Sequence, residues 1–510
     1  MMAENNLSAK VDAKRKLSMR INGWLFRYHR WFGIVSCVAV ILWGASGVMH
    51  PIMSRINPTP VNMQPPQAAV VLHGALAPAE VLARAGIGEA SGLRLLAWND
   101  TTYYQVSLPG QSGRRYFEVN SGVELIDGDE KYAEYLARYF IGDAQSKLRG
   151  VSLVKEFNDD YLNINRLLPV YRVDLERNDG LHAYVETSPA RVSALVDDRK
   201  ALLGSLFRIM HNWEFLNYAE SVRVTLISVL LAVALLSSLS GLWMYGFMWK
   251  RGTLQAGHLA LRRWHRMVGI WVSLSALLFV VSAEWHLLGS ERRTILPVIE
   301  GHIPSQQISL PDVVRHGGWG KINLLQVDGQ PLYQLQSSRQ KPAEVNDSAE
   351  HNHSVKSHVD SGTQSVYVNT QGEIVKDAER NHAIWLAGQF SMITADKVKE
   401  VSLVSKFEGE YGFLNKRLPV WRVDYDTPDH LSYYVETATG ALAAVVGDSG
   451  RAEGWSFAYL HKYHWLDFAG KDVRDFVMGL FGLGNLLIAL LGLWMFTRRY
   501  GKKGSVSKGQ

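Results

Sequence analysis

Six histidines occur near the ends of apolar segments, at positions that correspond between the two halves of the 510-residue chain. They form three corresponding pairs: His29 with His265, His50 with His286, and His211 with His461. Imidazole is a strong axial ligand of haem iron, and two imidazoles on one iron make a six-coordinate centre that suits electron transfer rather than oxygen binding. The repeated histidines therefore predict haem ligands and electron-transfer chemistry.

The spacing of the first four histidines fits the two surfaces of a membrane. His29 and His50 are 21 positions apart, as are His265 and His286. On an ideal helix this spacing gives a rise of about 31 Å and a difference in direction of about 60°, so both histidines share one broad face. Small residues on that face, such as Gly33, leave room for a flat macrocycle or a close helix contact. We expect His29 and His265 to pair at the cytoplasmic side.

The outer side has four candidate ligands and several ways to pair them. His50 and His286 could hold one haem and His211 and His461 another, or each of the latter could pair with a rim histidine of either half. The alternative interpretation is that a histidine at a membrane surface is only an interfacial polar residue. We expect two b-type haems, and the four outer histidines would also allow a third.

Four apolar runs without Asp, Glu, Lys or Arg are long enough to cross a membrane as helices, the third by a small margin. The runs are Trp31–Met49, Val224–Trp249, Met267–Ala283 and Phe476–Thr497. Basic residues concentrate before the first run, between the second and third, and after the fourth, which places these segments in the cytoplasm. The net charge of +6 is thus explained by topology and predicts contact with membrane lipid and no nucleic acid.

The two long stretches between the runs are similar to each other. Residues 93–106 match 322–335 at an offset of 229, and residues 151–187 match 401–437 at an offset of 250. Alternating apolar and polar residues predict strands in VYRVDL, HAYVET, WRVDYD, LSYYVET and SVYVNTQGEIV, and helical spacing occurs in PAEVLARAGI and KYAEYLARYFI. We expect an α+β lobe in each half, with helices against an antiparallel sheet.

These patterns predict a membrane protein with four transmembrane α-helices and two periplasmic α+β lobes. Because each half has two spans, the halves insert in one orientation as parallel repeats. The expected segments are a basic cytoplasmic leader (1–30), a first span (31–50), a first lobe (51–220), a second span (221–249), a cytoplasmic link (250–266), a third span (267–288), a second lobe (289–472) with a polar insert (336–364), a fourth span (473–497) and a cytoplasmic tail (498–510).

The first span is interpreted as a retained anchor rather than a cleaved signal peptide. Its apolar run is longer than a usual signal sequence, and the motif recurs around His265 in the middle of the chain. The only cysteine, Cys37, lies in this span, which excludes an intramolecular disulfide and a cysteine-held iron–sulfur cluster.

Several other polar residues have simpler interpretations. His464 has no counterpart in the first half and is interpreted as a local rim residue. Glu284 either interacts with a haem propionate or marks the end of its span. Ion pairs within strands are expected for Arg172 with Asp174 and for Arg422 with Asp424, and solvent exposure is expected for His351, His353 and His358, which could also bind a transition metal.

The motifs together resemble a known family. The span starts HRWFGI and WHRMVGI, the stretches LFRIMH and FAYLH, the GLW span ends at Gly241 and Gly492, and the YRVD…YVET strands resemble the PepSY-associated transmembrane protein family. This family includes bacterial inner-membrane reductases of ferric siderophores. The resemblance implies a haem-containing inner-membrane protein with periplasmic PepSY-like lobes, which passes electrons outward to a ferric siderophore or other iron chelate for iron release and uptake.

Missing motifs narrow the chemistry further. The chain has no C-x-x-C-H for covalent haem, no G-x-G-x-x-G, no P-loop and no H-E-x-x-H, so a separate cytoplasmic or quinol donor must supply the electrons. We therefore expect a transmembrane haem-dependent ferric-chelate reductase, with its catalytic residues unknown. The alternatives are a non-redox PepSY protein that binds or regulates periplasmic peptidases, and a transporter component. The apolar spans disfavour a transporter.

Overall fold

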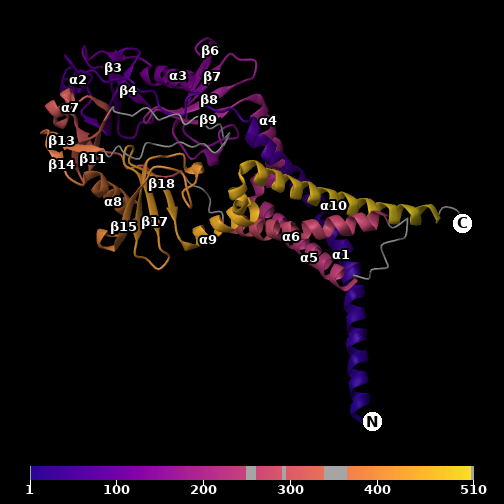
Figure 1. The fold of residues 1–510 in the computed structure, drawn as a ribbon. Helices are drawn as coiled ribbons and strands as arrows, with labels where there is room; N and C mark the ends of the chain where they lie inside the picture. The colour runs from indigo at the N-terminus through magenta and orange to yellow at the C-terminus, as the bar shows by residue number, and fades with distance from the viewer. Residues whose placement is uncertain (1, 249–259, 290–294, 338–364, 507–510) are drawn as a thin grey trace. The chain divides into compact units, whose positions relative to one another are not determined.

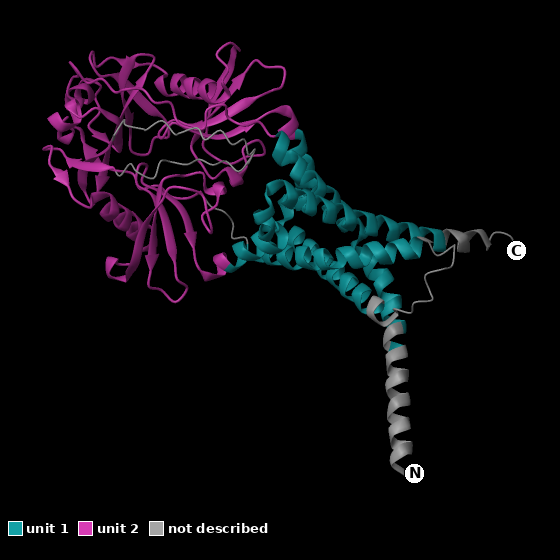
Figure 2. Ribbon diagram, in the orientation of Figure 1, with its two compact units in different colours: residues 1–56, 202–292, 452–510 teal, residues 57–201, 293–451 magenta. Residues whose placement is uncertain are grey.

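The computed structural model describes residues 2–248, 260–289, 295–337 and 365–506, which form two compact units (Figure 1). One unit, here called the helical unit, contains residues 1–56, 202–292 and 452–510 (Figure 2). The other, the sheet unit, contains residues 57–201 and 293–451. Each unit therefore draws on both halves of the sequence.

Four long helices dominate the helical unit. They are α1 (Met2–Ile56), α5 (Glu220–Met248), α6 (Ala260–Gly289) and α10 (Lys471–Val506). Among the described residues, four helical segments are long and apolar enough to cross a membrane: Gly23–Ile56, Glu214–Met244, Leu261–Gly289 and Lys471–Arg499. The prediction of four such helices is confirmed, and each begins earlier along the chain than its apolar run.

Small residues let these helices approach closely. Helix α1 packs against α5 and α10, and α6 packs against the same two helices (Figure 1). A Cβ added to Gly44 of α1 would lie 3.0 Å from the backbone nitrogen of Leu486 on α10. One added to Gly484 of α10 would lie 2.3 Å from Val272 on α6. Glycine at these contacts allows the backbone proximity that membrane helices use for packing.

A series of three short helical elements precedes each of the long helices α5 and α10. The first contains α4 (Asp198–Phe207), the π-helical turn η2 (Arg208–Asn212) and η3 (Glu214–Ala219). The second contains α9 (Asp448–Ser456), the π-helical turn η8 (Phe457–His461) and η9 (His464–Ala469). The turn η2 packs on α1 and η8 packs on α6, so the residues of both turns lie against the long helices.

An eight-stranded antiparallel sheet joins the two halves within the sheet unit. Its strand order is β14-β13-β12-β11-β2-β3-β4-β5. The strands are β2 (Gly92–Trp98), β3 (Thr101–Ser107), β4 (Arg114–Glu118), β5 (Glu124–Leu125), β11 (Trp319–Val327), β12 (Gln330–Ser337), β13 (Val366–Asn369) and β14 (Ile374–Val375). At the junction Leu95 pairs with Ile322, Arg94 with Asn323 and Leu93 with Leu324.

Two further four-stranded sheets have the same design. One consists of β6 (Leu148–Val154), β7 (Val170–Leu175), β8 (His182–Glu186) and β9 (Arg191–Val196). The other consists of β15 (Val398–Val404), β16 (Val420–Tyr425), β17 (Ser432–Glu436) and β18 (Ala441–Val446). Val151 pairs with Val173 and Val401 pairs with Val423, which is the same register at an offset of 250.

Helices cover the four-stranded sheets and complete the cores. Helix α3 (Gly128–Ile141) packs on the first sheet and α8 (Ala378–Ser391) on the second. The short α2 (Pro78–Arg84) and α7 (Asp312–His316) contribute to the core of the eight-stranded sheet. The smaller elements are β1 (Glu89–Ala90), β10 (Ile303–Pro304), η1 (Asn163–Asn165), η5 (Ser305–Gln307), η6 (Ala395–Lys397) and η7 (Phe413–Asn415).

The secondary structure expected between the spans is confirmed at each stretch named above. PAEVLARAGI contains α2 and KYAEYLARYFI lies within α3, while the alternating stretches form β7, β8, β16, β17, β13 and β14. We expected a separate lobe in each half, but the eight-stranded sheet contains strands from both halves. In separate lobes β2 and β11 would be sheet edges with unpaired backbone groups, and their pairing satisfies both.

Candidate functional site

The inner histidine pair comes from two helices that pack against the same two neighbours. His29 lies on α1 and His265 on α6, and both helices contact α5 and α10. The centroids of the two imidazole rings are 6.4 Å apart, with 69° between the ring planes. The structure thus brings together the two histidines that the sequence pairs at the cytoplasmic side.

Hydrogen bonds orient the first of these rings. His29 Nδ1 lies 3.1 Å from the carbonyl oxygen of Ser237 and 3.0 Å from Ser240 Oγ. Because a carbonyl oxygen only accepts hydrogen bonds, Nδ1 carries the proton and the lone pair remains on Nε2. Metal-binding histidines are commonly held in this way by a second group on the other ring nitrogen. Ile488 stands on α10 where Ser237 stands on α5, and its backbone faces His265 without the geometry of a full hydrogen bond.

The repeated GLW motif has a direct role beside these histidines. A Cβ added to Gly241 would lie 3.3 Å from His29 Cε1, and one added to Gly492 would lie 3.5 Å from His265 Cε1. A side chain at either glycine would press on the imidazole behind it. Sequence similarity marks the two glycines, but their contact with the histidines is visible only in three dimensions.

The outer pair consists of His211 and His461. Their ring centroids are 6.3 Å apart and the rings are perpendicular, at 90°. Each histidine lies on a π-helical turn, His211 on η2 and His461 on η8. In η8 the backbone N–H of Lys462 donates to the carbonyl of Phe457, five residues earlier, at 3.0 Å. Single π-turns often occur at functional sites, and this one widens the helix where the histidine must point inward.

The surroundings of the two outer histidines differ in their polar contacts. Ser46 Oγ lies 2.9 Å from His211 Nδ1, and the Trp43 indole N–H donates to the His211 carbonyl at 3.2 Å. Ser282 corresponds to Ser46 but donates to the carbonyl of Ser456 instead, at 3.3 Å. His461 Nδ1 is buried and has no hydrogen-bond partner among the described residues.

The other two rim histidines stand behind phenylalanines. Phe207 stacks on His211 at 4.7 Å and contacts His50 at 5.6 Å. Phe457 stacks on His461 at 4.9 Å and on His286 at 4.5 Å. Among the ring contacts of the described residues, His211 therefore meets His461, while His50 and His286 each form the outer end of a stack of three rings.

The partners of these two end histidines are of opposite charge. The Lys462 ammonium lies 3.0 Å from His50 Nε2, whereas His286 Nδ1 contacts the Glu453 carboxylate. Neither Lys462 nor Glu453 repeats, since their counterparts in the first half are Asn212 and Leu203. Sequence reasoning missed both residues because it relied on positions that the two halves share. It also missed Phe207 and Phe457, which do repeat, at an offset of 250.

Burial lowers the pKa values of both histidines of the outer pair. Burial lowers the pKa of His211 to about 4, with smaller effects from the charges of Lys462 and His286. Burial, followed by the neighbouring His211, holds the pKa of His461 well below its usual range. At neutral pH both imidazoles are uncharged, which is the form that binds metals.

The ring separations of both pairs can be compared with those of two imidazoles on one iron. An imidazole nitrogen binds a transition metal at about 2 Å, so two opposed rings on one metal have centroids about 6 Å apart. The observed 6.4 and 6.3 Å agree with this arrangement. No group of three or more His, Cys, Asp or Glu side chains among the described residues could hold a bare metal ion.

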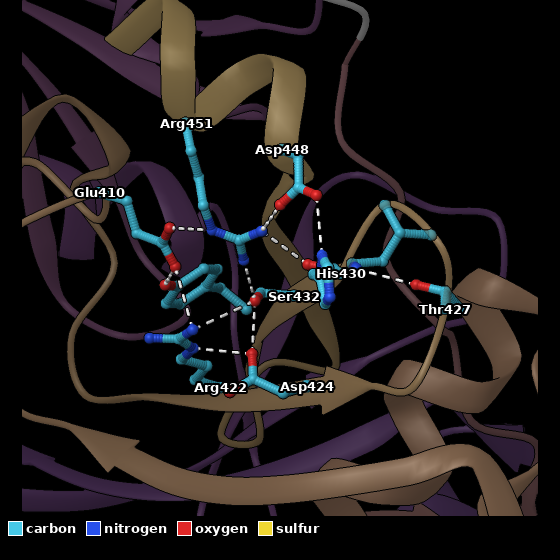
Figure 3. Close-up of polar contacts among 10 residues, drawn as sticks. Glu410, Arg422, Asp424, Thr427, His430, Ser432, Asp448 and Arg451 are labelled. Carbon is cyan, nitrogen blue, oxygen red and sulfur yellow. Dashed lines mark hydrogen bonds and ion pairs between the residues drawn. The ribbon is translucent and has the colours of Figure 1, made fainter. Parts of the chain in front are cut away.

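The Arg–Asp pairs expected within the strands form ion pairs in both four-stranded sheets. Arg172 pairs with Asp174 at 3.0 Å, as expected. The corresponding Arg422 and Asp424, 2.8 Å apart, belong to a larger network in which Arg451 of α9 contacts Glu410 and Ser432 (Figure 3). This network ties α9 to the second four-stranded sheet.

Three other expectations concern single positions. His464 contacts Asp467 at 2.7 Å, which fits a local rim residue. Glu284 Oε2 is buried without a hydrogen-bond partner among the described residues, and its link to a haem propionate remains a prediction. The insert histidines His351, His353 and His358 lie outside the described residues.

Comparison with known proteins adds no family to this geometry. Neither the models of protein families nor the sequences of curated proteins match the chain.

Proposed function

We propose that the protein is a b-type haem oxidoreductase of the bacterial inner membrane. The observation that carries the proposal is the pair of histidine contacts, His29 with His265 and His211 with His461, at ring separations of 6.4 and 6.3 Å. Each pair would hold one haem, and haem supplies a metal centre that gains and loses single electrons. Two such centres in one four-helix bundle form a path for electrons along the bundle.

Two features of the sequence support a direction of transfer and an acceptor. The basic segments favour cytoplasmic termini, with the sheet unit built from two PepSY-like lobes in the periplasm. The resemblance to PepSY-associated transmembrane proteins, and the two parallel repeats that the offsets indicate, support transfer from a cytoplasmic or quinol donor to a periplasmic ferric siderophore or other iron chelate. The chain's own residues bind and orient the two haems, and the lipid-facing apolar helices keep water from the inner pair.

The test is a visible spectrum of the purified protein. Protein expressed with ample haem should show, after dithionite reduction, the sharp α and β bands of low-spin cytochrome b. His464→Ala is the matched control, because His464 is a rim histidine with a local partner, and it should keep the full spectrum. A folded but colourless wild-type protein would contradict the proposal and favour the non-redox PepSY alternative.

The membrane topology has an independent test. Reporter fusions at Asp198 and Gly447, which lie at the ends of the two PepSY-like segments, should be active only as periplasmic reporters. Cytoplasmic activity at either position would contradict the proposed topology.

A further inference from the structure

One of the two three-ring stacks ends in a histidine with the form of a metal ligand. The His286 ring stacks on Phe457 at 4.5 Å and 28°, and Phe457 stacks on His461 at 4.9 Å and 15°. The side chain of His286 is 36% exposed and that of Glu453 is 22% exposed, and their contact joins the imidazole Nδ1 to the carboxylate. The stack thus connects an outer-pair histidine to an accessible imidazole.

The carboxylate prepares this imidazole for a metal. A carboxylate accepts from Nδ1–H, so the lone pair of His286 stays on Nε2, which has no partner among the described residues. Metal-bound histidines are typically held by a carboxylate on the second ring nitrogen, which fixes the tautomer and raises the basicity of the ligand.

The corresponding stack in the first half, of His50, Phe207 and His211, does not end in a free imidazole nitrogen oriented by a carboxylate. His50 lies 5.6 Å from Phe207 at 54°, which is a poorer stack. Its Nε2 accepts from the Lys462 ammonium, so this nitrogen is occupied and a positive charge stands beside it. Leu203 replaces the carboxylate of Glu453 in this half. A cationic metal centre would therefore be repelled at His50 and accepted at His286.

We propose that His286 and Glu453 form the docking site for the ferric chelate, with His286 Nε2 as a ligand to the chelated iron and Glu453 as its positioning residue. This inference rests on the proposed function. One imidazole is not a closed metal site, and no three-ligand group occurs among the described residues. The iron must therefore arrive with its own ligands and one exchangeable position, as a chelate does.

The step balances as a single-electron transfer. His286 Nε2 replaces a water or weak ligand on the chelated Fe(III), and no proton moves. A reduced haem held by His211 and His461 would supply the one electron that converts the docked Fe(III) to Fe(II), and this haem would itself be oxidised by one electron. The bond from Nε2 to iron then breaks as the ferrous chelate departs.

A redox-inert probe tests docking separately from reduction. Gallium(III) nitrilotriacetate has the charge and ligand preferences of its ferric counterpart but accepts no electron, and its binding to the haem-loaded protein is measured by titration calorimetry. Wild type should bind saturably, His286→Ala should lose binding, and Glu453→Gln should bind at least about 10-fold more weakly. The matched control His50→Ala should bind as wild type does.

A kinetic measurement accompanies the titration. Dithionite-reduced protein mixed with ferric nitrilotriacetate should be reoxidised more slowly in His286→Ala than in His50→Ala, with the same starting spectrum in both. Equal gallium affinity in wild type and His286→Ala would overturn the inference, as would equal loss in His50→Ala. A colourless wild type contradicts the proposed function, whereas a normal haem spectrum without gallium binding contradicts the docking site alone.

Discussion

The inner histidine pair lies on two regular α-helices, whereas the outer pair lies on two π-helical turns. Around the inner pair are glycines beside both rings, and a serine hydroxyl and a backbone carbonyl that orient His29. Around the outer pair are two phenylalanines, two more histidines, a lysine and a glutamate. The two pairs thus differ in their surroundings, and under the proposed function this difference predicts a rigid inner centre and an outer centre that exchanges electrons with an external acceptor.

The comparison predicts that the inner centre is the more fragile to loss of a ligand. His265→Ala should remove the inner haem entirely, since no third histidine contacts His29 or His265 among the described residues. The haem content per protein, measured by pyridine haemochrome assay, should fall by about half if each pair holds one haem. A cytoplasmic donor should no longer reduce the outer haem, although dithionite should still do so. Full haem content in this variant would make His265 an ordinary rim residue.

The outer centre should respond to the same change less completely. His461→Ala leaves His211, and His286 stands two stacked rings away with an Nε2 that has no partner in the described part of the chain. We expect partial retention of the outer haem with an altered spectrum, and normal reduction of the inner haem. The measurement is a redox titration followed by absorbance, and the double variant with His286→Ala should lose the remaining outer signal. Identical behaviour of His265→Ala and His461→Ala would remove the distinction between the centres.

Much of this arrangement follows from local sequence patterns. Apolar runs predict the four helices because a membrane-spanning helix needs a fixed length of uncharged chain. Alternation predicts β7 and β16 because one face of each strand is buried. The pairing of His29 with His265 follows from their matching positions, and the structure brings the two rings together.

Other features leave no local pattern. The pairing of β2 with β11 joins strands more than 200 positions apart, and each strand would look the same as a sheet edge. The π-helical turns differ from α-helix by one hydrogen-bond step, which composition does not reveal, and they carry the two histidines, His211 and His461, whose rings meet. Lys462 and Glu453 occupy positions where the halves differ, so the repeat conceals them.

Crowding behind the inner imidazole should have a smaller effect than its removal. Gly241→Val would place a Cβ 3.3 Å from His29 Cε1, with two methyl groups beyond it, and so turn the ring away from the iron. We expect lower haem occupancy of the inner site at limiting haem and an unchanged outer site, measured from the spectrum during haem titration. Gly47→Val is the control, because nothing lies within 4 Å of a Cβ added there. Equal losses in the two variants would indicate general damage to helix packing.

The smallest effect should come from the hydrogen bond that orients His29. Ser240 Oγ lies 3.0 Å from His29 Nδ1 and itself donates to the Ser237 carbonyl at 2.9 Å, so the serine shares an acceptor with the ring. In Ser240→Ala the carbonyl still accepts from Nδ1, which preserves the tautomer, but one electron-donating contact is lost. Loss of such a second group typically weakens metal binding about 10-fold or more, and the retained carbonyl should keep the effect at the low end. The inner haem should therefore remain bound with a raised midpoint potential, because a less basic imidazole stabilises the ferric state less.

Ser237→Ala is the control, since its backbone carbonyl persists, and the midpoint potential of its inner haem should equal that of wild type. Because Ser240 and Ser237 contact His29, and the serine beside the outer pair is Ser46 at His211, the outer potential should stay constant in both variants. A shift of the outer potential with an unchanged inner potential would contradict the assignment of the inner haem to His29.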